Sequence, residues 1–384
     1  MVNEWALGTV WPGDEMNNSP LPGQSDLDAI NERLFVPPLT SGADNAAPLS
    51  SSSSSANYTD AASSSSRLNP QTEGLDWFLR RPSWNIAYHY TPPCSAPPAA
   101  VFTNFVRGLQ SWLVRFLRMG HNPFIHRHLY SETTLPQCMQ DAYAAIAISQ
   151  TITPENEHLV DTTTSGYILS LLAANSAAEP AFLPLLSTRD HLARTQALLI
   201  HVILCLYSSS IPRRAKAESL IDTIRLWARQ LWESAALDAT SSPPFPNALS
   251  TTGDYHNRDE GVVSSLHRAF ILSESVRRTF LLTSITTGVY TSLKATWAYA
   301  CAGDVCITLR QELWEAPSSA RWEAAARKED PLFLHSLKCE SIILRGVQAI
   351  EVDEYARLIF TVLWGLEKVE HWVISTGDSV SIMY

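Results

Sequence analysis

The sequence predicts an all-α protein, an irregular multi-helix bundle preceded by a disordered N-terminal region. Apolar residues recur every three or four positions from about residue 97 onward, and no segment shows sustained alternation of apolar and polar residues. The chain has 384 residues, of which 45% are hydrophobic and only 15 are glycine. A folded part of roughly 300 residues buries about three quarters of its unfolded surface, so it can be stable without disulfides or metals.

The N-terminal region, residues 1–95, has the acidic, Ser- and Pro-rich composition of a disordered tail. Eleven of the 26 residues in 41–66 are serine, and a proline cluster follows at 92–98. Such a segment buries too little apolar surface to offset its ordering entropy. Two short islands interrupt the tail: 26–35 has apolar residues at helical spacing, and 75–90 is rich in aromatic residues and is expected to pack on the folded body.

The remaining residues, 96–384, form the predicted helical domain. Apolar residues of its first helix share one face: Phe102, Phe105, Leu109, Trp112 and Phe116. Pro136 opens a second helix, and Thr153 followed by Pro154 predicts the N-cap and first position of a third. Periodicity predicts further helices near 188–208, 213–236, 262–299, 318–329, 331–345 and 351–374. A loop rich in Ser and Pro is expected near 238–260.

Charge and targeting signals exclude several classes of protein. The net charge is −10 and no lysine precedes Lys216, which argues against broad nonspecific binding of nucleic acid. The first 15 residues have neither a basic start nor a continuous apolar stretch, so no signal peptide is expected. The densest apolar run covers 197–207, whereas a membrane span needs about 20 residues. We therefore predict no membrane association.

The six cysteines are predicted to be reduced packing residues. They lie far apart, at positions 94, 138, 205, 301, 306 and 339, and the one close pair has no second pair to complete a tetrahedral metal site. This spacing indicates a reducing compartment and no structural zinc.

We predict no catalytic, cofactor-binding or metal-binding residues. Neither of the usual glycine-rich phosphate loops occurs, and the G-x-S-x-G nucleophile turn is absent. Gly377-Asp378-Ser379 resembles a lipase-like nucleophile block, but no histidine follows it to accept the serine proton.

Three other groups of residues have a functional and a structural interpretation. His121, His126 and His128 could hold a metal, but no carboxylate stands nearby, and a helix end followed by a polar turn is favoured. Arg213, Arg214 and Lys216 could contact an anion at a helix start, and a solvated turn is favoured. Five tryptophans could form a ligand box, and core packing is favoured: Trp297, Trp314, Trp322, Trp364 and Trp372.

One basic pair is expected to be structural. Glu274 and Arg278 are four residues apart on a helix, the spacing of an ordinary stabilising pair worth a few tenths of a kcal/mol, while Phe280 and Leu281 face the core. Pro317 is expected to end a helix, and Ser318 or Ser319 is expected to cap the next one.

Five sequence blocks together resemble the helical regulatory region of fungal zinc binuclear-cluster transcription factors. They are LPQCMQDAY (135–143), LARTQALLI (192–200), SESVRRT (273–279), LWEAPSSARW (313–322) and DEYARLIFTVLWG (353–365). The resemblance covers roughly residues 100 to 375. It implies a nuclear protein that regulates transcription, and members of this family often govern secondary-metabolite biosynthetic gene clusters.

The family's DNA-reading module has six closely spaced cysteines that bind two zinc ions, and no such spacing occurs here. No zinc ligand or base-contacting residue is therefore carried over, and direct DNA contact is left open. The expected partners are the transcription machinery or another DNA-binding factor, unless an exon upstream of Met1 encodes the zinc cluster. Both a homo-oligomer and a hetero-oligomer are compatible with the sequence.

Two alternatives remain beside this interpretation. The first is a helical ligand-sensing or scaffold protein without DNA binding, with an apolar effector between its helices. The second is an enzyme of unrecognised type. It ranks last, because no adjacent acidic pair is followed by the third acid of a magnesium-binding cluster. The acidic segment 1–40, with Trp5 and Trp11, fits either a coactivator-binding segment or a merely solvating tail.

Overall fold

The structure, a computed structural model, describes residues 74–88, 97–131, 133–176, 186–241, 244–245, 262–294 and 303–384. The chain divides after Arg67, and every described residue belongs to the second unit, Leu68–Tyr384. The predicted disorder of the tail and its island at 26–35 lie outside the described residues, as does most of the predicted loop near 238–260.

The fold class is confirmed as all-α with two short strands. The longer helices are α2 (Ala99–Met119), α3 (Gln137–Ser149), α4 (Glu157–Ala174), α5 (Thr188–Leu206), α7 (Ile221–Ala239) and α9 (Val262–Lys294). The shorter helices are α6 (Ile211–Glu218), α10 (Gln311–Trp314), α11 (Ser319–Lys328), α12 (Ser341–Leu344), α13 (Glu354–Trp364) and α14 (Leu366–Ser375). Among the described residues there are also three 3₁₀ turns, η2 (Arg81–Trp84), η3 (Ser336–Lys338) and η4 (Ala349–Glu351).

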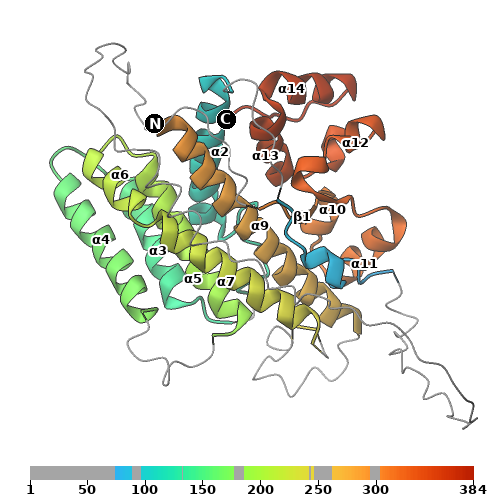
Figure 1. The fold of residues 1–384 in the computed structure, drawn as a ribbon, viewed down its shortest axis with the longest axis horizontal. Coiled ribbons are helices and arrows are strands. Elements are labelled where there is room, and N and C mark those ends of the chain that lie inside the picture. Colours follow the sequence, from blue (N-terminus) through green and yellow to red (C-terminus); the bar gives the residue numbers. More distant parts are fainter. Residues whose placement is uncertain are drawn as a thin grey trace, which may run out of the picture. The chain divides into compact units, whose positions relative to one another are not determined.

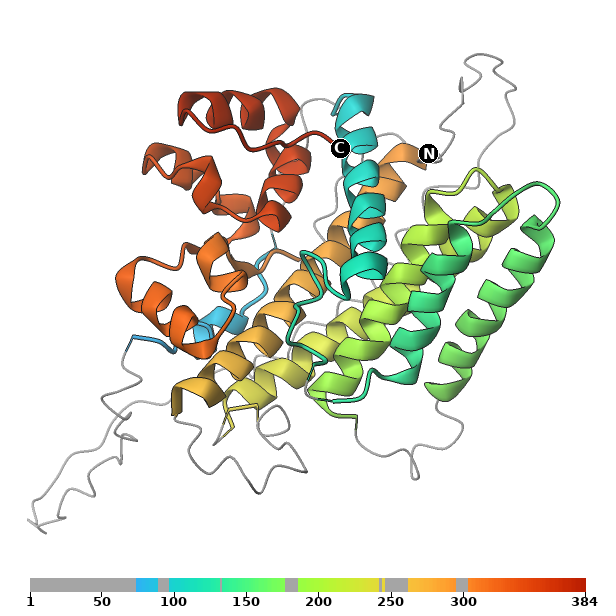
Figure 2. The ribbon, with the colours of Figure 1, turned by 180° about the vertical axis from the view of Figure 1, so that it is seen from behind.

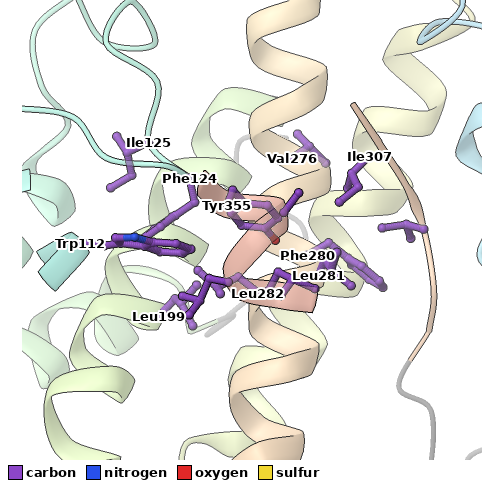
Figure 3. Close-up of a cluster of buried hydrophobic side chains, with 14 of the residues drawn as sticks. Trp112, Phe124, Ile125, Leu199, Val276, Phe280, Leu281, Leu282, Ile307 and Tyr355 are labelled. Carbon is purple, nitrogen blue, oxygen red and sulfur yellow. The ribbon is translucent and has the colours of Figure 1, made fainter. Parts of the chain in front are cut away.

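Helix α9 is the centre of the second unit. On one side, α7, α5 and α4 follow it in succession, and α10 to α14 lie on its other side (Figures 1 and 2). Every residue in 269–283 is buried, so this part of α9 is enclosed on all sides. Side chains from α2, α5, α9, α13 and β1 meet around it (Figure 3). The expected core positions of Phe280 and Leu281 are confirmed.

The aromatic island that precedes α2 packs on this core, as its composition predicts. Leu75, Phe78 and Trp84 are buried, and the rings of Trp77 and Trp322 stack at 5.9 Å between centroids. Residues 89 and 90 of the island lie outside the described part. The contacts with the helical core thus begin at Leu75, before the start of the predicted helical domain at residue 96.

Several predicted helix boundaries are confirmed. Helix α5 begins with a capping box between Ser187 and Asp190, and the Oγ of Ser318 caps α11 by accepting a hydrogen bond from the backbone N–H of Arg321. Pro136 stands at the N-cap of α3, as expected. The last residues of the helix predicted for 262–299 lie outside the described part.

Three predicted helices are wrong in detail. The helix expected at 213–236 is two helices, α6 and α7, separated at Ser219 and Leu220. Helix α4 begins at Glu157 rather than at Pro154, because the side chain of Asn156 bonds the backbone of Thr151 and Thr153 and closes a turn. The helix expected at 351–374 breaks at Gly365, whose φ of 90° suits glycine.

The helix predicted for 331–345 is replaced by a strand and two short helical turns. Leu332 has a φ of 52°, which ends helical geometry, and β2 (Phe333–His335) pairs antiparallel with β1 (Cys306–Thr308). The pairing partner of β2 is distant in sequence, so periodicity within the segment does not reveal it.

Candidate functional site

The described part of α9 buries three charged side chains in its middle. Glu274, Arg277 and Arg278 are each 0% exposed. Burying a charge is costly unless other groups pair with it, so each of these side chains must find its partners inside the protein. The interactions of the two arginines differ.

Arg278 joins four segments of the chain. Its guanidinium donates to the Oε1 of Glu274 at 3.2 Å and forms a salt bridge with Asp353. It also donates to the carbonyl oxygens of Pro123 (2.9 Å) and Thr308 (3.2 Å). These bonds connect α9 to the turn after α2, to β1 and to the N-cap of α13.

Further contacts hold this network in place. The guanidinium lies 3.8 Å from the centroid of the Trp314 ring, and the hydroxyl of Tyr355 donates to the backbone carbonyl of Arg278 at 2.7 Å. Glu274 accepts a second hydrogen bond from the backbone N–H of Thr308, at 3.0 Å. Asp353 caps α13 through the N–H of Ala356. Protein groups thus pair the charges of this network, while the second carboxylate oxygen of Glu274, Oε2, has no hydrogen-bond partner among the described residues.

Burial raises the pKa values of Glu274 and Asp353, and the neighbouring charge of Arg278 opposes both shifts. For Arg278 itself burial disfavours the charge, but Asp353 and Glu274 outweigh burial, so its pKa is raised. The arginine therefore stays charged between two carboxyl groups.

The predicted pair between Glu274 and Arg278 is therefore confirmed, but the prediction that it is an ordinary helix pair is wrong. The two residues do pair, but both are fully buried and share a network with Asp353. The spacing of four residues reveals the pair, whereas the partners that enclose it come from distant parts of the sequence.

Arg277 binds the segment that precedes α2. It donates to the carbonyl oxygens of Phe78 (2.8 Å) and Ser83 (3.1 Å), and it lies 4.0 Å from the centroid of the Trp84 ring. Burial lowers its pKa to about 10. Since no carboxylate bonds it directly among the described residues, backbone carbonyls and aromatic faces stabilise its charge.

Helix α2 ends at Gly120, which has a left-handed conformation. His121, His126 and His128 lie in the turn that follows, as predicted. The turn is more buried than expected, since His126 is 3% exposed. Both ring nitrogens of His126 are occupied: Nε2 lies 2.8 Å from the carbonyl of Trp314, and Nδ1 accepts the N–H of His128. Within the described ranges, no group of three or more His, Cys, Asp or Glu residues could hold a metal ion.

The basic run at the start of α6 has internal partners. Arg213 forms a salt bridge with Asp161 of α4, and Arg214 donates to the carbonyl oxygens of Ser208 (2.6 Å) and Ser209 (2.9 Å). The anion that Arg213 contacts therefore belongs to the chain itself, and the favoured solvated turn is wrong for this residue.

The remaining candidates are accounted for by packing and capping. Asp378 accepts hydrogen bonds from the N–H of Ile350 and the hydroxyl of Thr376, so it stabilises the end of α14. Core packing is confirmed for Trp314, Trp322 and Trp372, whereas Trp364 is half-buried and Trp297 lies outside the described residues. The described cysteines, Cys138, Cys205, Cys306 and Cys339, are free thiols.

A cavity of about 240 Å³ lies where the turn after α2, the start of α5, α9 and the start of α11 meet. Its lining residues are His128, Leu129, Arg189, His267, Arg268, Ile271, Leu272, Pro317, Ser318 and Ser319. We call this the α9–α11 cavity. None of the ten is acidic, and four carry a basic or imidazole side chain.

Sequence reasoning missed most of the polar lining of this cavity. Arg189, His267 and Arg268 lie far apart or within apolar helices, and only folding brings them together. The one available signal was the adjacent pair His267-Arg268 inside a segment that is otherwise apolar.

The chain is similar to a fungal transcription factor. Over 270 residues it is 26% identical to Transcription factor gsfR2 of Penicillium aethiopicum, which covers 70% of this chain and 60% of that protein. The chain thus spans less than two thirds of the length of this relative. No family model and no solved structure matches the chain. Among the described residues, no helix combines the length and the apolar composition needed to cross a bilayer.

Proposed function

We propose that this chain is a transcriptional regulator that acts in the nucleus, with the helical unit as its regulatory region. The observation that carries the proposal is the 26% identity to a fungal transcription factor over 270 residues. The five sequence blocks between residues 135 and 365, which resemble the regulatory region of fungal zinc binuclear-cluster transcription factors, support the same proposal. The resemblance to the zinc binuclear-cluster family further implies control of a secondary-metabolite biosynthetic gene cluster.

The character of the polar core favours a non-enzymatic role. The charges on α9 are bound by other protein groups: Arg278 by Glu274 and Asp353, and Arg277 by backbone carbonyls. A catalytic site leaves its reactive groups open to a substrate. We therefore infer that this network stabilises a regulatory fold and has no part in a reaction.

The regulator is proposed to act with the transcription machinery or with another DNA-binding factor. The net charge of −10 supports this route, because a strongly basic face is what binds DNA backbones directly.

The proposal is tested by deleting the gene in the source organism and measuring all transcripts. A coordinated change across neighbouring biosynthetic genes, reversed by the wild-type chain, is expected. Complementation with D353N, which alters the buried network, is compared with complementation by the exposed variant E340Q. An unchanged set of transcripts in the deletion strain would overturn the proposal.

A further inference from the structure

We propose that the α9–α11 cavity is a binding site for a small organic anion, a molecule with a carboxylate or phosphate group and a compact apolar part. The inference concerns binding and goes beyond the proposed function. It stands on the charge of the lining, on buried nitrogen atoms without partners, on a helix N-terminus and on the size of the cavity.

The lining has a one-sided charge. Arg189 enters from the start of α5 and Arg268 from α9, while His128 and His267 add two imidazole rings. None of the ten lining residues is an aspartate or a glutamate. An anion in this cavity would therefore meet cationic and hydrogen-bonding groups without a competing carboxylate in the wall.

Three nitrogen atoms of the lining residues are buried and have no hydrogen-bond partner within the described part of the chain. They are the Nε2 of His128, the Nε2 of His267 and the Nε of Arg189. His267 is only 5% exposed, and its ring is held by stacking on Trp322, with centroids 5.4 Å apart. Leaving a buried polar atom unpaired costs about 1–3 kcal/mol, so a polar ligand that paired any of the three would be stabilised by that contact.

The protonation of His267 is consistent with this environment. Burial first, and then the neighbouring His128 and Arg268, lower its pKa to about 4. The neutral ring then presents one N–H donor without adding a buried charge of its own. An anion would gain that hydrogen bond and offset the positive field of the arginine side chains.

The N-terminus of α11 faces the same cavity through Ser318 and Ser319. This helix has 10 residues, and its cap, Ser318, bonds the N–H of Arg321 at 3.3 Å. The first N–H groups of a helix lack partners within the helix, and its dipole favours negative charge at that end. The helix end therefore adds donors to the same wall.

The volume and the apolar part of the wall limit the ligand. A cavity of about 240 Å³ accommodates a compact metabolite. Leu129, Ile271, Leu272 and Pro317 supply the apolar contacts. An aromatic or branched acid, or a small phosphate ester, matches this wall.

Isothermal titration calorimetry on the purified full chain tests the proposal with three probes. Benzoate represents the carboxylates, inorganic phosphate represents the phosphates, and benzamide is the uncharged counterpart of benzoate. We expect saturable binding of benzoate or of phosphate and none of benzamide. Which anion binds identifies the headgroup. Absence of saturable binding by both anions, or equal binding of benzamide, would overturn the proposal.

Variants locate the binding. R189Q with R268Q removes both fixed charges of the wall and should weaken anion binding about tenfold or more. The matched control is R107Q, at an exposed position of α2, which should bind as the wild type does. Wild-type affinity in the double variant would place the bound anion elsewhere and overturn the assignment.

S319D keeps the test decisive if the double variant fails to fold. An aspartate at the first position of α11 favours the helix dipole, so this variant should fold at least as well as the wild type. Its carboxylate lies in the cavity wall and should abolish anion binding. Unchanged binding in a folded S319D protein would contradict the proposed site.

Discussion

The guanidinium carbon of Arg277 lies 4.0 Å from the centroid of the Trp84 ring, although 193 residues separate the two in sequence. Through this contact and through hydrogen bonds to Phe78 and Ser83, the segment before α2 is bound to the central helix. The indole of Trp232 adds a bond to the carbonyl of Trp84, at 3.0 Å. The segment is thus a part of the core and not an appendage.

Replacing Trp84 by alanine is therefore expected to destabilise the fold strongly. The ring is 6% exposed and covers a buried guanidinium, so W84A should lower the free energy of unfolding by about 3–5 kcal/mol. Y88A, at a side chain that is 60% exposed, should change it by less than about 0.5 kcal/mol. Urea unfolding measures both, and equal stability of the two variants would show that the segment does not belong to the core.

The second prediction concerns the charge network. R278M keeps most of the side-chain volume but leaves Glu274 and Asp353 without their cation, and it should cost about 3–5 kcal/mol. Adding E274Q and D353N should restore part of the loss, since the amides keep the acceptors for Thr308 and Ala356.

The exposed pair Arg345–Asp330 supplies the control for this prediction. Its side chains are 42% and 51% exposed, and R345M should cost no more than about 1 kcal/mol. Chemical unfolding of the four proteins gives the comparison. If R278M and R345M lowered the free energy of unfolding by similar amounts, the buried network would contribute no more to stability than an exposed ion pair.

The third prediction is a loss of stability in mild acid. Burial lowers the pKa values of His191, His201 and His267 to about 4, below the value near 6.5 of an unfolded chain. As the pH falls below 6.5, the unfolded state takes up protons before the folded state does. The stabilisation is thus complete above pH 6.5 and is lost progressively toward pH 4.

His201 is the clearest single test, because it is 1% exposed. Between pH 7 and pH 5 its contribution to the free energy of unfolding should fall by about 2 kcal/mol. The H201Q protein should therefore lose about 2 kcal/mol less stability than the wild type over this range. H158Q, at an exposed position, controls for the change of composition. Parallel curves for the wild type and H201Q would contradict the assignment.

Two helical glycines give the fourth prediction. A Cβ at Gly166 of α4 would meet nothing within 4 Å, so G166A should stabilise the fold by about 1 kcal/mol through helix propensity alone. A Cβ at Gly108 of α2 would lie 2.7 and 2.8 Å from the methyl carbons of the buried Leu358.

Overpacking of this kind costs about 1–3 kcal/mol, so G108A should be no more stable than the wild type in spite of the same gain in propensity. Thermal unfolding ranks the variants. If G108A were as stable as G166A, the close approach of α2 and α13 would be wrong.

The sequence predicts the helices well where apolar periodicity and a cap agree. Helix α5, with its capping box, and α11, with Ser318 as cap, are examples. Prediction failed for β2 because its pairing partner, residues 306–308, is distant in sequence. It failed for the start of α4 for a local reason, since the side chain of Asn156 bonds the backbone of the turn before the helix.

The same limit applies to the buried charges and to the cavity. The spacing of Glu274 and Arg278 predicts their pairing, but the carbonyl of Pro123 and the carboxylate of Asp353 are 155 and 75 residues away from Arg278. The cavity depends on four segments meeting, and no local pattern indicates that Arg189 lies near His267. Residue type shows which groups need partners, and only the tertiary fold determines which partners they find.

The position of the aromatic segment has a consequence for synthesis on the ribosome. Trp77 and Phe78 emerge well before Phe270 and Trp322, the rings that cover them in the finished protein. For most of translation the nascent chain therefore carries exposed aromatic side chains near its start, where chaperones that bind apolar segments can act. Fragments that end before α9 should aggregate, because they contain the segment and lack the surface that receives it.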